Sequence, residues 1–414
     1  MNLVFFLLTL SAFALAAWSE ATRGGGAMAA LAEATLKAAE GAVPLALGLV
    51  GVMALFLGLM KVAEAGGMVR ALARLLAPVL TRLFPEVPAG HPAMGAMVMN
   101  VAANILGLGN AATPFGIRAM EHLERLNPVK GTASNAQVLF LAINTAGITI
   151  LPTSVIALRA GLGAAEPAAV VAPTLAATLV STAIAIAAAR LLQRWSPVSG
   201  TMVADAGFDD ADPIVPAPRW ACWLAGLAVL AVIPVMALKG AVLGPWIVPG
   251  LVVGLLGYGL ARRVPVYEAF VEGAREGFTI AVRIIPYLVA ILVAVAMFRA
   301  SGAMDAVLAP LGRLLAPLGV PAEALALAGM RSLSGSGAFA FLAATLKDPA
   351  IGIDSAAAVL LGTIYGSSET TFYVIAVYFG AVGIRRIRHA LAAGLIADLG
   401  GLVAAIVICR LLYP

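Results

Sequence analysis

The stretch Gly362-Thr-Ile-Tyr-Gly-Ser-Ser-Glu-Thr-Thr-Phe-Tyr373 is a polar island inside an apolar segment that runs from Ala356 to Gly380. The whole segment is long enough to cross a bilayer core of about 30 Å. Glycine weakens a helix at the island, and the hydroxyls and the carboxylate of Glu369 need partners that lipid does not offer. A polar break in a membrane span is typical of a cavity or an ion path. The stretch therefore predicts half of a transport site.

The composition of the chain indicates that this span is one of several. Of the 414 residues, 62% are hydrophobic and only 11% are charged, whereas a soluble protein carries roughly 25% charged residues. We therefore expect a polytopic membrane protein whose surroundings are membrane lipids. Basic loops on the cytoplasmic face explain the net charge of +5, so we expect no nucleic-acid partner. Cys222 and Cys409 form neither a CxxC pair nor a metal-ligand spacing, and we interpret them as small core residues.

The amino terminus predicts the orientation of the chain. The segment from Leu3 to Ala17 resembles a signal peptide, but no Lys or Arg precedes its apolar run. We expect it to be retained as a first transmembrane helix. With nine spans, the larger share of the Lys and Arg residues falls on the amino-terminal side. This bias predicts a bacterial cytoplasmic (inner) membrane protein with a cytoplasmic amino terminus.

Sequence features recur in the same order in the two halves of the chain. Glu40-Gly41 matches Glu276-Gly277, and Gly66 matches Gly302, both at an offset of 236 residues. Further on, Phe140–Leu192 runs parallel to Leu360–Leu412 at an offset of 220. Each match is sparse, and the shared order is what indicates a repeat. We divide the chain into a first repeat at 1–195, a cytoplasmic linker at 196–219, and a connecting helix with the second repeat at 220–414.

Each repeat predicts the same series of elements. A span is followed by an amphipathic helix, a second span, another amphipathic helix, a re-entrant hairpin, a broken span and a final span. One extra span between the repeats, Trp220–Leu238, makes the second repeat enter the membrane from the opposite side. The expected fold class is an all-α polytopic membrane protein with two inverted-topology repeats, re-entrant helical hairpins and broken transmembrane helices. The expected elements before the hairpins are Leu3–Trp18, Met28–Ala39 and Val43–Met60 in the first repeat, and Pro245–Leu260, Val266–Glu276 and Thr279–Met297 in the second.

The first expected hairpin has an asparagine-rich tip. Asn100 and Asn104 share one helix face, and Gly107 and Gly109 allow a tight turn. Pro114 suits the first turn of the next helix, with Asn110 or Thr113 near its cap. A helix amino terminus at such a tip offers N–H groups to an anion or a polar ligand. The alternative is that the asparagines only bridge helices, as polar residues do in membranes.

The second expected hairpin has a serine- and glycine-rich tip. The run Arg331-Ser-Leu-Ser-Gly-Ser-Gly337 lies between the apolar arms Ala322–Met330 and Ala338–Leu346. It is either an ordinary flexible turn or the counterpart of the asparagine-rich tip. We expect Ser332, Ser334 and Ser336 to bind a substrate or an ion there, and Arg331 to pair with a carboxylate or with an anionic substrate.

The broken spans complete the expected site. Pro152 removes a helix hydrogen bond after Asn144 and Thr145, and Thr149 is the counterpart of Glu369 at the offset of 220. We expect Glu369 to bind a coupling ion or the substrate; a structural pair with Arg283 or Lys61 is the alternative. The intramembrane Asp398 fits either role equally, including that of a charge partner. The expected ligands in these spans are Asn144, Thr145, Thr149, Ser367, Ser368, Glu369 and Thr370.

The sequence carries no pattern of an enzyme. Its three histidines show no metal-ligand spacing, and no catalytic triad order, P-loop or HExxH motif is present. We expect no enzymatic activity, no metal site and no cofactor apart from a coupling H⁺ or Na⁺.

Several motifs resemble known families over nearly the whole chain. The first half is similar to the spore maturation protein A family at Leu59–Glu64, Phe84–Gly95, Gly107–Ile117 and Leu151–Arg159. The second half resembles the spore maturation protein B family at Val264–Phe278, Phe298–Met304 and Glu369–Arg385. The chain thus resembles a natural fusion of the two.

The resemblance implies two nucleoside recognition, or Gate, domains. Related domains occur in concentrative nucleoside transporters and in ferrous-iron transporters of the B family, which place ligands at hairpin tips and unwound helices. We therefore expect an ion-coupled secondary transporter that moves a small polar or charged solute by alternating access. The alternatives are a membrane scaffold or sensor in envelope or spore maturation, and a protein that handles lipid-linked precursors. By analogy with these families we expect a homo-oligomer.

Overall fold

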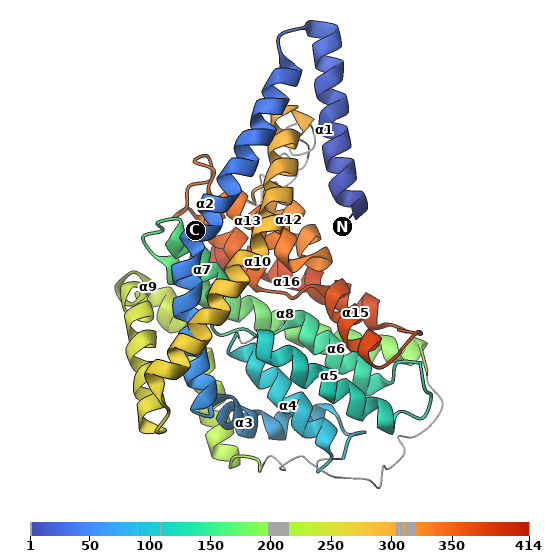
Figure 1. Cartoon of the computed structure of the whole chain (residues 1–414). Coiled ribbons are helices and arrows are strands. Elements are labelled where there is room, and N and C mark those ends of the chain that lie inside the picture. The colour runs from blue at the N-terminus through green and yellow to red at the C-terminus, as the bar shows by residue number, and fades with distance from the viewer. Residues whose placement is uncertain are drawn as a thin grey trace.

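The computed structural model describes residues 2–88, 90–107, 109–197, 215–303, 306, 310 and 320–413, and within them the chain is helical. Figure 1 shows helices throughout, with α2 and α10 lying along each other and α1 projecting beside them. The described residues add one isolated parallel β-bridge, between Thr132 and Arg386. The all-α fold class predicted from the sequence is confirmed.

The first repeat begins with long helices and continues with shorter ones. Ser134 starts α6 with a capping box, in which its hydroxyl accepts from the N–H of Gln137 and the Gln137 side chain accepts from the N–H of Ser134. Pro92 opens α4 directly after the cap residue His91. The elements are α1 (Asn2–Arg23), α2 (Ala27–Ala65), α3 (Met68–Leu83), α4 (Pro92–Ile105), α5 (Gly109–Leu126), α6 (Asn135–Ala146), α7 (Thr153–Gly161), η1 (Pro167–Val170), α8 (Val171–Leu192) and η2 (Gln193–Trp195).

The second repeat follows the same order. Ser334 and Ser355 each accept a hydrogen bond from the backbone N–H three residues on, which caps α13 and α14. The elements are α9 (Arg219–Ala261), α10 (Val266–Ala300), α12 (Glu323–Leu333), α13 (Gly335–Leu346), α14 (Ala356–Gly366), α15 (Thr371–Ala381) and α16 (Ala390–Leu412). Most of the expected linker lies outside the described residues.

Two of the expected divisions are wrong. The amphipathic segment and the span of each repeat form one continuous helix, α2 in the first and α10 in the second, although Pro44 and Pro286 lie inside them. The two helices pack closely because glycines face the partner backbone. A Cβ at Gly273 would lie 2.5 Å from the carbonyl oxygen of Leu57. Packing through small residues stabilises both helices past their prolines.

Helix α9 doubles back on itself. The N–H of Ala217, just before α9, donates to Arg74, whereas Arg262, just after it, donates to Gly66. Gly66 and Arg74 lie only eight residues apart in the chain, at the junction of α2 and α3. A straight α9 of 43 residues would be about 64 Å long, too long for its two ends to reach these neighbouring positions. The two ends of α9 therefore lie near each other, as the two separate spans expected in this region require.

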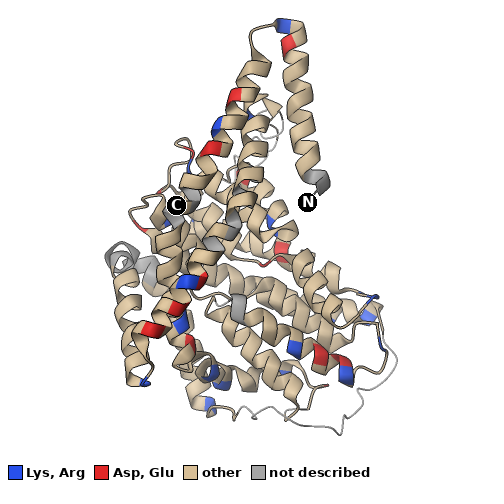
Figure 2. Cartoon of the chain, viewed as in Figure 1, with Lys and Arg blue, Asp and Glu red and all other residues tan. Residues whose placement is uncertain are grey.

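Three described helices are long and apolar enough to cross a membrane. They are Phe5–Arg23, Pro167–Trp195 and Ala390–Leu412, and the bent pair Val50–Ala65 and Met68–Leu83 adds a fourth if it counts as one span. Figure 2 shows charged residues sparse on most helices and more frequent along α2 and α10. These helices identify a membrane protein; the count of nine crossings remains a prediction.

The two largest hydrophobic cores of the described residues show how the repeats are joined. One core is built from α4, α5 and α6 of the first repeat, and it contains Val374, Tyr378 and Phe379 of α15. The other is built from α12, α13 and α14, and it contains Val155, Ile156 and Leu158 of α7. Each broken span thus begins in one core and ends in the other. The two breaks lie where the span passes between the cores.

Loops at the two ends of the broken spans confirm the inverted arrangement. The loop after α7 meets the loop before α14, because Ala165 donates to the carboxylate of Asp354 at 3.0 Å. The loop after α15 meets the loop before α6, because Arg385 donates to Gly131, also at 3.0 Å. In each contact the end of one broken span meets the start of the other, as two antiparallel repeats require.

Candidate functional site

The two helix breaks lie against each other. The first, Gly147–Pro152, separates α6 from α7, and the second, Ser367–Thr370, separates α14 from α15. The N–H of Glu369 donates to the Thr145 carbonyl at 2.7 Å. Gly147 has a φ of 38°, and a Cβ there would lie 3.4 Å from Glu369 Cγ. The break therefore brings the Glu369 side chain close to the unwound backbone of the first repeat.

Each hairpin tip packs on the break of its own repeat. At the α4–α5 tip, Ile150 donates to the Ile105 carbonyl at 3.0 Å. Gly107 has a φ of 75°, and a Cβ there would lie 2.8 Å from the Leu151 carbonyl oxygen. At the α12–α13 tip, a Cβ at Gly335 would lie 2.9 Å from Thr370 Oγ1. Both tips thus reach the junction of the two cores.

Arg331 and Glu369 form an ion pair at this junction. Arg331 Nη2 lies 3.1 Å from Glu369 Oε2, with the arginine side chain 7% exposed and the glutamate 50% exposed. The guanidinium also donates to the Tyr365 carbonyl and to Thr370 Oγ1, at 3.0 and 2.9 Å. Its carbon lies 4.6 Å from the centre of the Tyr365 ring, a cation–π distance. Arg331 is held on all sides, whereas Glu369 keeps an open face.

Asp398 lies beside this pair, within α16. Its Oδ2 accepts from Ser332 Oγ at 2.6 Å and from Thr371 Oγ1 at 2.7 Å. Its Oδ1 is buried and makes no hydrogen bond. Asp398 therefore connects the α12–α13 hairpin, the second break and the final span.

Asparagine amides and one tyrosine form a second polar group in the first repeat. Asn104 donates to Asn144 Oδ1 at 2.9 Å, and Tyr378 donates to the same oxygen at 3.3 Å. Asn100 donates to Tyr378 at 3.1 Å and to the Ala112 carbonyl at 2.8 Å. Tyr378 comes from α15 and stacks on Phe140, so the second repeat completes the hydrogen bonds of the first hairpin.

Other expected ligands bond mainly to nearby backbone. The hydroxyls of Thr145 and Ser367 donate to carbonyls in their own helix turns, and Ser334 caps α13. Thr149 donates its hydroxyl to Gly147 and its N–H to Thr178, and these contacts do not include Glu369. Ser368 is buried at the break, Ser336 is partly buried in α13, and Thr113 lies inside α5. The side chains of Asn110 and Arg283 lie outside the described part of the structure.

Two structural expectations about these residues are wrong. Helix α5 begins at Gly109, so Pro114 lies inside it beyond the first turn, although Asn110 does lie near the start of the helix. The left-handed Gly107 completes the turn early, which lets the helix start before the proline. Lys61 pairs with Glu272 at 3.2 Å and Glu64 at 3.7 Å, and Glu369 takes Arg331 as its partner instead.

The expected ligands did not include Tyr378, Thr371 or Tyr365, although the last two belong to the stretch 362–373 that the sequence singled out. All three lie in apolar helices, where a hydroxyl or a ring carries no periodic signal. Gly116 was the available hint for Tyr378, because a Cβ there would lie 2.3 Å from the tyrosine oxygen. A glycine inside a helix next to a predicted ligand region indicates that a large side chain from elsewhere approaches it.

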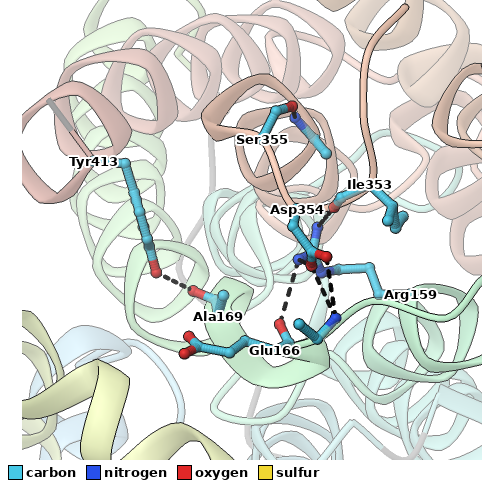
Figure 3. A network of polar contacts seen from close by, with 9 residues as sticks. Arg159, Glu166, Ala169, Ile353, Asp354, Ser355 and Tyr413 are labelled. Carbon is cyan, nitrogen blue, oxygen red and sulfur yellow. Dashed lines mark hydrogen bonds and ion pairs between the residues drawn. The ribbon is translucent and has the colours of Figure 1, made fainter. Parts of the chain in front are cut away.

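Arg159 and Arg388 join the repeats at the ends of the broken spans. Arg159 is 1% exposed and donates to the carbonyls of Ile353 and Glu166, at 2.9 and 3.3 Å, while lying 3.7 Å from the Asp354 carboxylate. Figure 3 shows this network, with Tyr413 bonded to Ala169 beside it. Arg388 donates to the Ala133 carbonyl and to Asn135 Oδ1 at the other inter-repeat contact.

Comparisons with known proteins agree with this architecture. The family model described as Gate, nucleoside recognition, matches residues 46–162 and 281–385. Spore maturation protein A of Bacillus subtilis is 45% identical over 141 residues, which cover 34% of this chain and 72% of that protein. Spore maturation protein B of the same organism is 45% identical over 166 residues, which cover 40% of this chain and 92% of that protein.

One solved structure aligns with nearly the whole chain at low similarity. The crystal structure of the YdaH transporter of Alcanivorax borkumensis aligns over 98% of this chain and 97% of its own, with a TM-score of 0.39 and 17% identity. A score this low does not establish a common fold. The two spore maturation relatives match different parts of the chain, and the matched Gate segments contain both breaks and both hairpins. The chain therefore belongs to the Gate (nucleoside recognition) family, as a fusion of a spore maturation protein A relative with a spore maturation protein B relative.

Proposed function

We propose that this protein is a secondary transporter of a small polar or charged solute, without enzymatic activity. The observation that carries the proposal is the half-exposed carboxylate of Glu369 at the junction of two broken helices. A carboxylate inside a membrane protein is costly unless it serves a partner or a water-filled path. Arg331 neutralises its charge, and its remaining open face is available to a ligand.

The groups around Glu369 suit a solute with several hydrogen-bonding groups. Asn104, Asn144 and Tyr378 offer amide and hydroxyl groups, and the Arg331–Glu369 pair offers both signs of charge. Nucleosides carry donors and acceptors that match amides, and the family description makes them the first solutes to test.

The inverted repeats support alternating access. Each break is held by its own hairpin tip and by the break of the other repeat, and exchange of these contacts would open the site to either side. We place the protein in the bacterial cytoplasmic membrane with its amino terminus in the cytoplasm, surrounded by lipid and assembled as a homo-oligomer. It requires no nucleic acid and no cofactor beyond a coupling cation.

A second candidate is a membrane scaffold or sensor. The curated relatives are named for spore maturation, which does not require solute movement. Phe6 and Trp18 of α1 are 58% and 69% exposed, so this helix presents apolar side chains that lipid or another membrane protein could cover. A scaffold does not need the polar contacts between the two breaks, so we favour transport.

The test is ligand-dependent thermal stabilisation of the purified full-length protein. The panel contains nucleosides, amino acids, inorganic phosphate, divalent metal ions and polyprenyl phosphates, each measured also with Glu369→Gln. A ligand at 100 times its dissociation constant adds about 2.7 kcal/mol to the stability of the folded state. Stabilisation by a solute that disappears in the variant supports the site. No stabilisation of a folded protein by any member of the panel would favour the scaffold.

A further inference from the structure

Asp398 is a carboxylate without a positive partner of its own. It lies in the middle of α16, a helix long and apolar enough to span a membrane. Both of its donors, Ser332 and Thr371, are neutral hydroxyls, and both bond to Oδ2. Oδ1 is buried with no hydrogen bond. An ionised carboxylate in this position leaves a charged oxygen unsatisfied, which costs several kcal/mol in an apolar medium.

The charged groups that face Asp398 do not remove this cost. They are Arg331 of α12 and Glu369 of the second break, and they form an ion pair with each other at 3.1 Å. Along their described lengths, α6, α14 and α15 contain no Asp, Glu, Lys or Arg, and the single charged residue of α8 is Arg190 in its last turn. The tyrosines nearby, Tyr365 and Tyr378, are engaged with Arg331 and with the asparagine amides.

A proton fits this site better than a metal cation. Sodium needs several oxygen ligands spread around it, whereas both hydroxyls here lie at hydrogen-bond distance from one carboxylate oxygen. A proton on Asp398 neutralises the buried charge and needs no further ligand. We propose that Asp398 is the proton-binding group of this protein and that its protonation releases the α12–α13 hairpin from α16. The coupling role of this proton rests on the proposed transport function, whereas proton binding itself does not.

The release follows from the hydrogen bonds of Ser332. A hydroxyl bonds to an ionised carboxylate about twice as strongly as to a neutral acceptor. When Asp398 takes up a proton, its oxygens lose the negative charge and the acid itself becomes a donor. The Ser332 hydroxyl already lies 3.5 Å from the Ala328 carbonyl of its own helix, so it turns to that acceptor without moving the backbone.

The contact with Thr371 holds the other side of Asp398 in place. One turn before the carboxylate, a Cβ at Gly394 would lie 2.8 Å from Thr371 Cγ2. Helix α16 therefore packs on the start of α15 whatever the state of the acid. Both hydroxyl bonds weaken when Asp398 takes up a proton, but this packing keeps α15 in place on α16, so the hairpin is the element that moves.

The experiment measures the proton and the hairpin separately, without any solute. Infrared difference spectra across a pH titration follow the C=O stretch of a protonated carboxylic acid. In a background with Cys222→Ser and Cys409→Ala, the Ser336→Cys variant reports access to the hairpin through its rate of maleimide labelling. Trp195 is 76% exposed, and a parallel Trp195→Cys variant corrects for the pH dependence of thiol reactivity.

We expect the labelling rate to rise at least about fivefold as Asp398 becomes protonated, the lower end of typical coupling energies between sites. Asp398→Asn should remove the carboxylic band and label fast at every pH. Ser332→Ala should also label fast at every pH while the band still titrates. Asp354→Asn, a change of a carboxylate at the inter-repeat contact, should keep both responses.

Three results would overturn the proposal. One is a carboxylic band that persists unchanged in Asp398→Asn. Another is labelling in Ser332→Ala that keeps the pH dependence of the parent, which also decides the case if Asp398→Asn does not fold. The third is labelling that follows sodium concentration at fixed pH, which would assign a metal cation to the site. Because no solute is present, none of these results depends on the ligand panel, and failure of that panel would leave proton binding in place.

Discussion

The Arg331–Glu369 pair gives a prediction whose size follows from its geometry. At 3.1 Å, two unit charges attract by about 1 kcal/mol in water and by about 5 kcal/mol at an effective dielectric constant of 20. Arg331 is buried and Glu369 is half exposed, so the interaction lies between these limits, at about 2 kcal/mol. Glu369→Gln keeps an acceptor for the guanidinium and removes the charge.

A double-mutant cycle isolates this term. Glu369→Gln leaves a buried guanidinium without a counter-charge, and we expect it to lower the free energy of unfolding by about 2–3 kcal/mol. Arg331→Met also loses the bonds to Tyr365 and Thr370, and we expect a loss of about 3–4 kcal/mol. The double variant should be about 2 kcal/mol more stable than the sum of the single losses predicts.

The assay is equilibrium unfolding of the purified protein in mixed micelles. Glu272→Gln is the matched control, because Glu272 also pairs with a cation at 3.2 Å but its side chain is 64% exposed. An exposed pair contributes under about 1 kcal/mol, so this variant should change stability little. If the Arg331 and Glu369 losses add to within about 0.5 kcal/mol, the two residues do not interact as the distance implies, and the electrostatic account of the site is refuted.

Two further predictions test contacts between the repeats, and a third tests a loop within the second repeat. Gly116→Ala places a Cβ 2.3 Å from Tyr378 Oη and should lower the free energy of unfolding by about 1–3 kcal/mol. The control is Gly95→Ala, which has open space around its Cβ and should be neutral or stabilising. Equal thermal stabilities of the two variants would refute the close approach of Tyr378. Arg159→Met leaves the Ile353 and Glu166 carbonyls without their donor and should lower the free energy of unfolding by about 2–4 kcal/mol. Asp354→Asn changes a half-exposed partner and should lower it by about 1 kcal/mol or less. If thermal unfolding gives the reverse order, the burial assigned to Arg159 is contradicted. In the loop before α14, the N–H of Ala350 and the Arg299 guanidinium lower the pKa of Asp348 below its usual 3.8. The contribution of Asp348 to stability is therefore complete above that pH and is lost as the pH falls further. Asp348→Asn should reduce the loss of thermal stability at acid pH, and an unchanged acid dependence would exclude the contribution.

The broken spans and the hairpins could be predicted because each leaves a local mark in the sequence. Polar and glycine residues in an apolar run identified the break at Ser367–Thr370, and Pro152 identified the break before α7. The serine–glycine run predicted the α12–α13 turn in the same way. A membrane interior makes such marks reliable, because every unwound backbone group there needs a partner.

The continuous helices α2 and α10 could not be predicted by the same reasoning. The sequence analysis divided each of them into an amphipathic helix and a separate span, but what decides continuity is the partner helix. Gly273 and Gly277 allow α10 to approach the backbone of α2 closely, and this packing is not visible in either segment alone. The contacts of Tyr378 were missed for the same reason, since they join residues more than 230 positions apart.

The asymmetry of the site follows from how the two repeats diverged. At the offset of 220, Thr149 occupies the place of Glu369, and its contacts are a carbonyl of its own break and a hydroxyl of α8. The first repeat therefore contributes neutral amides, and the second contributes Arg331, Glu369 and Asp398. The α12–α13 hairpin contacts both carboxylates, Glu369 through Arg331 and Asp398 through Ser332. A solute at Glu369 and a proton at Asp398 would then act on one moving element, and this shared element is what ion coupling requires.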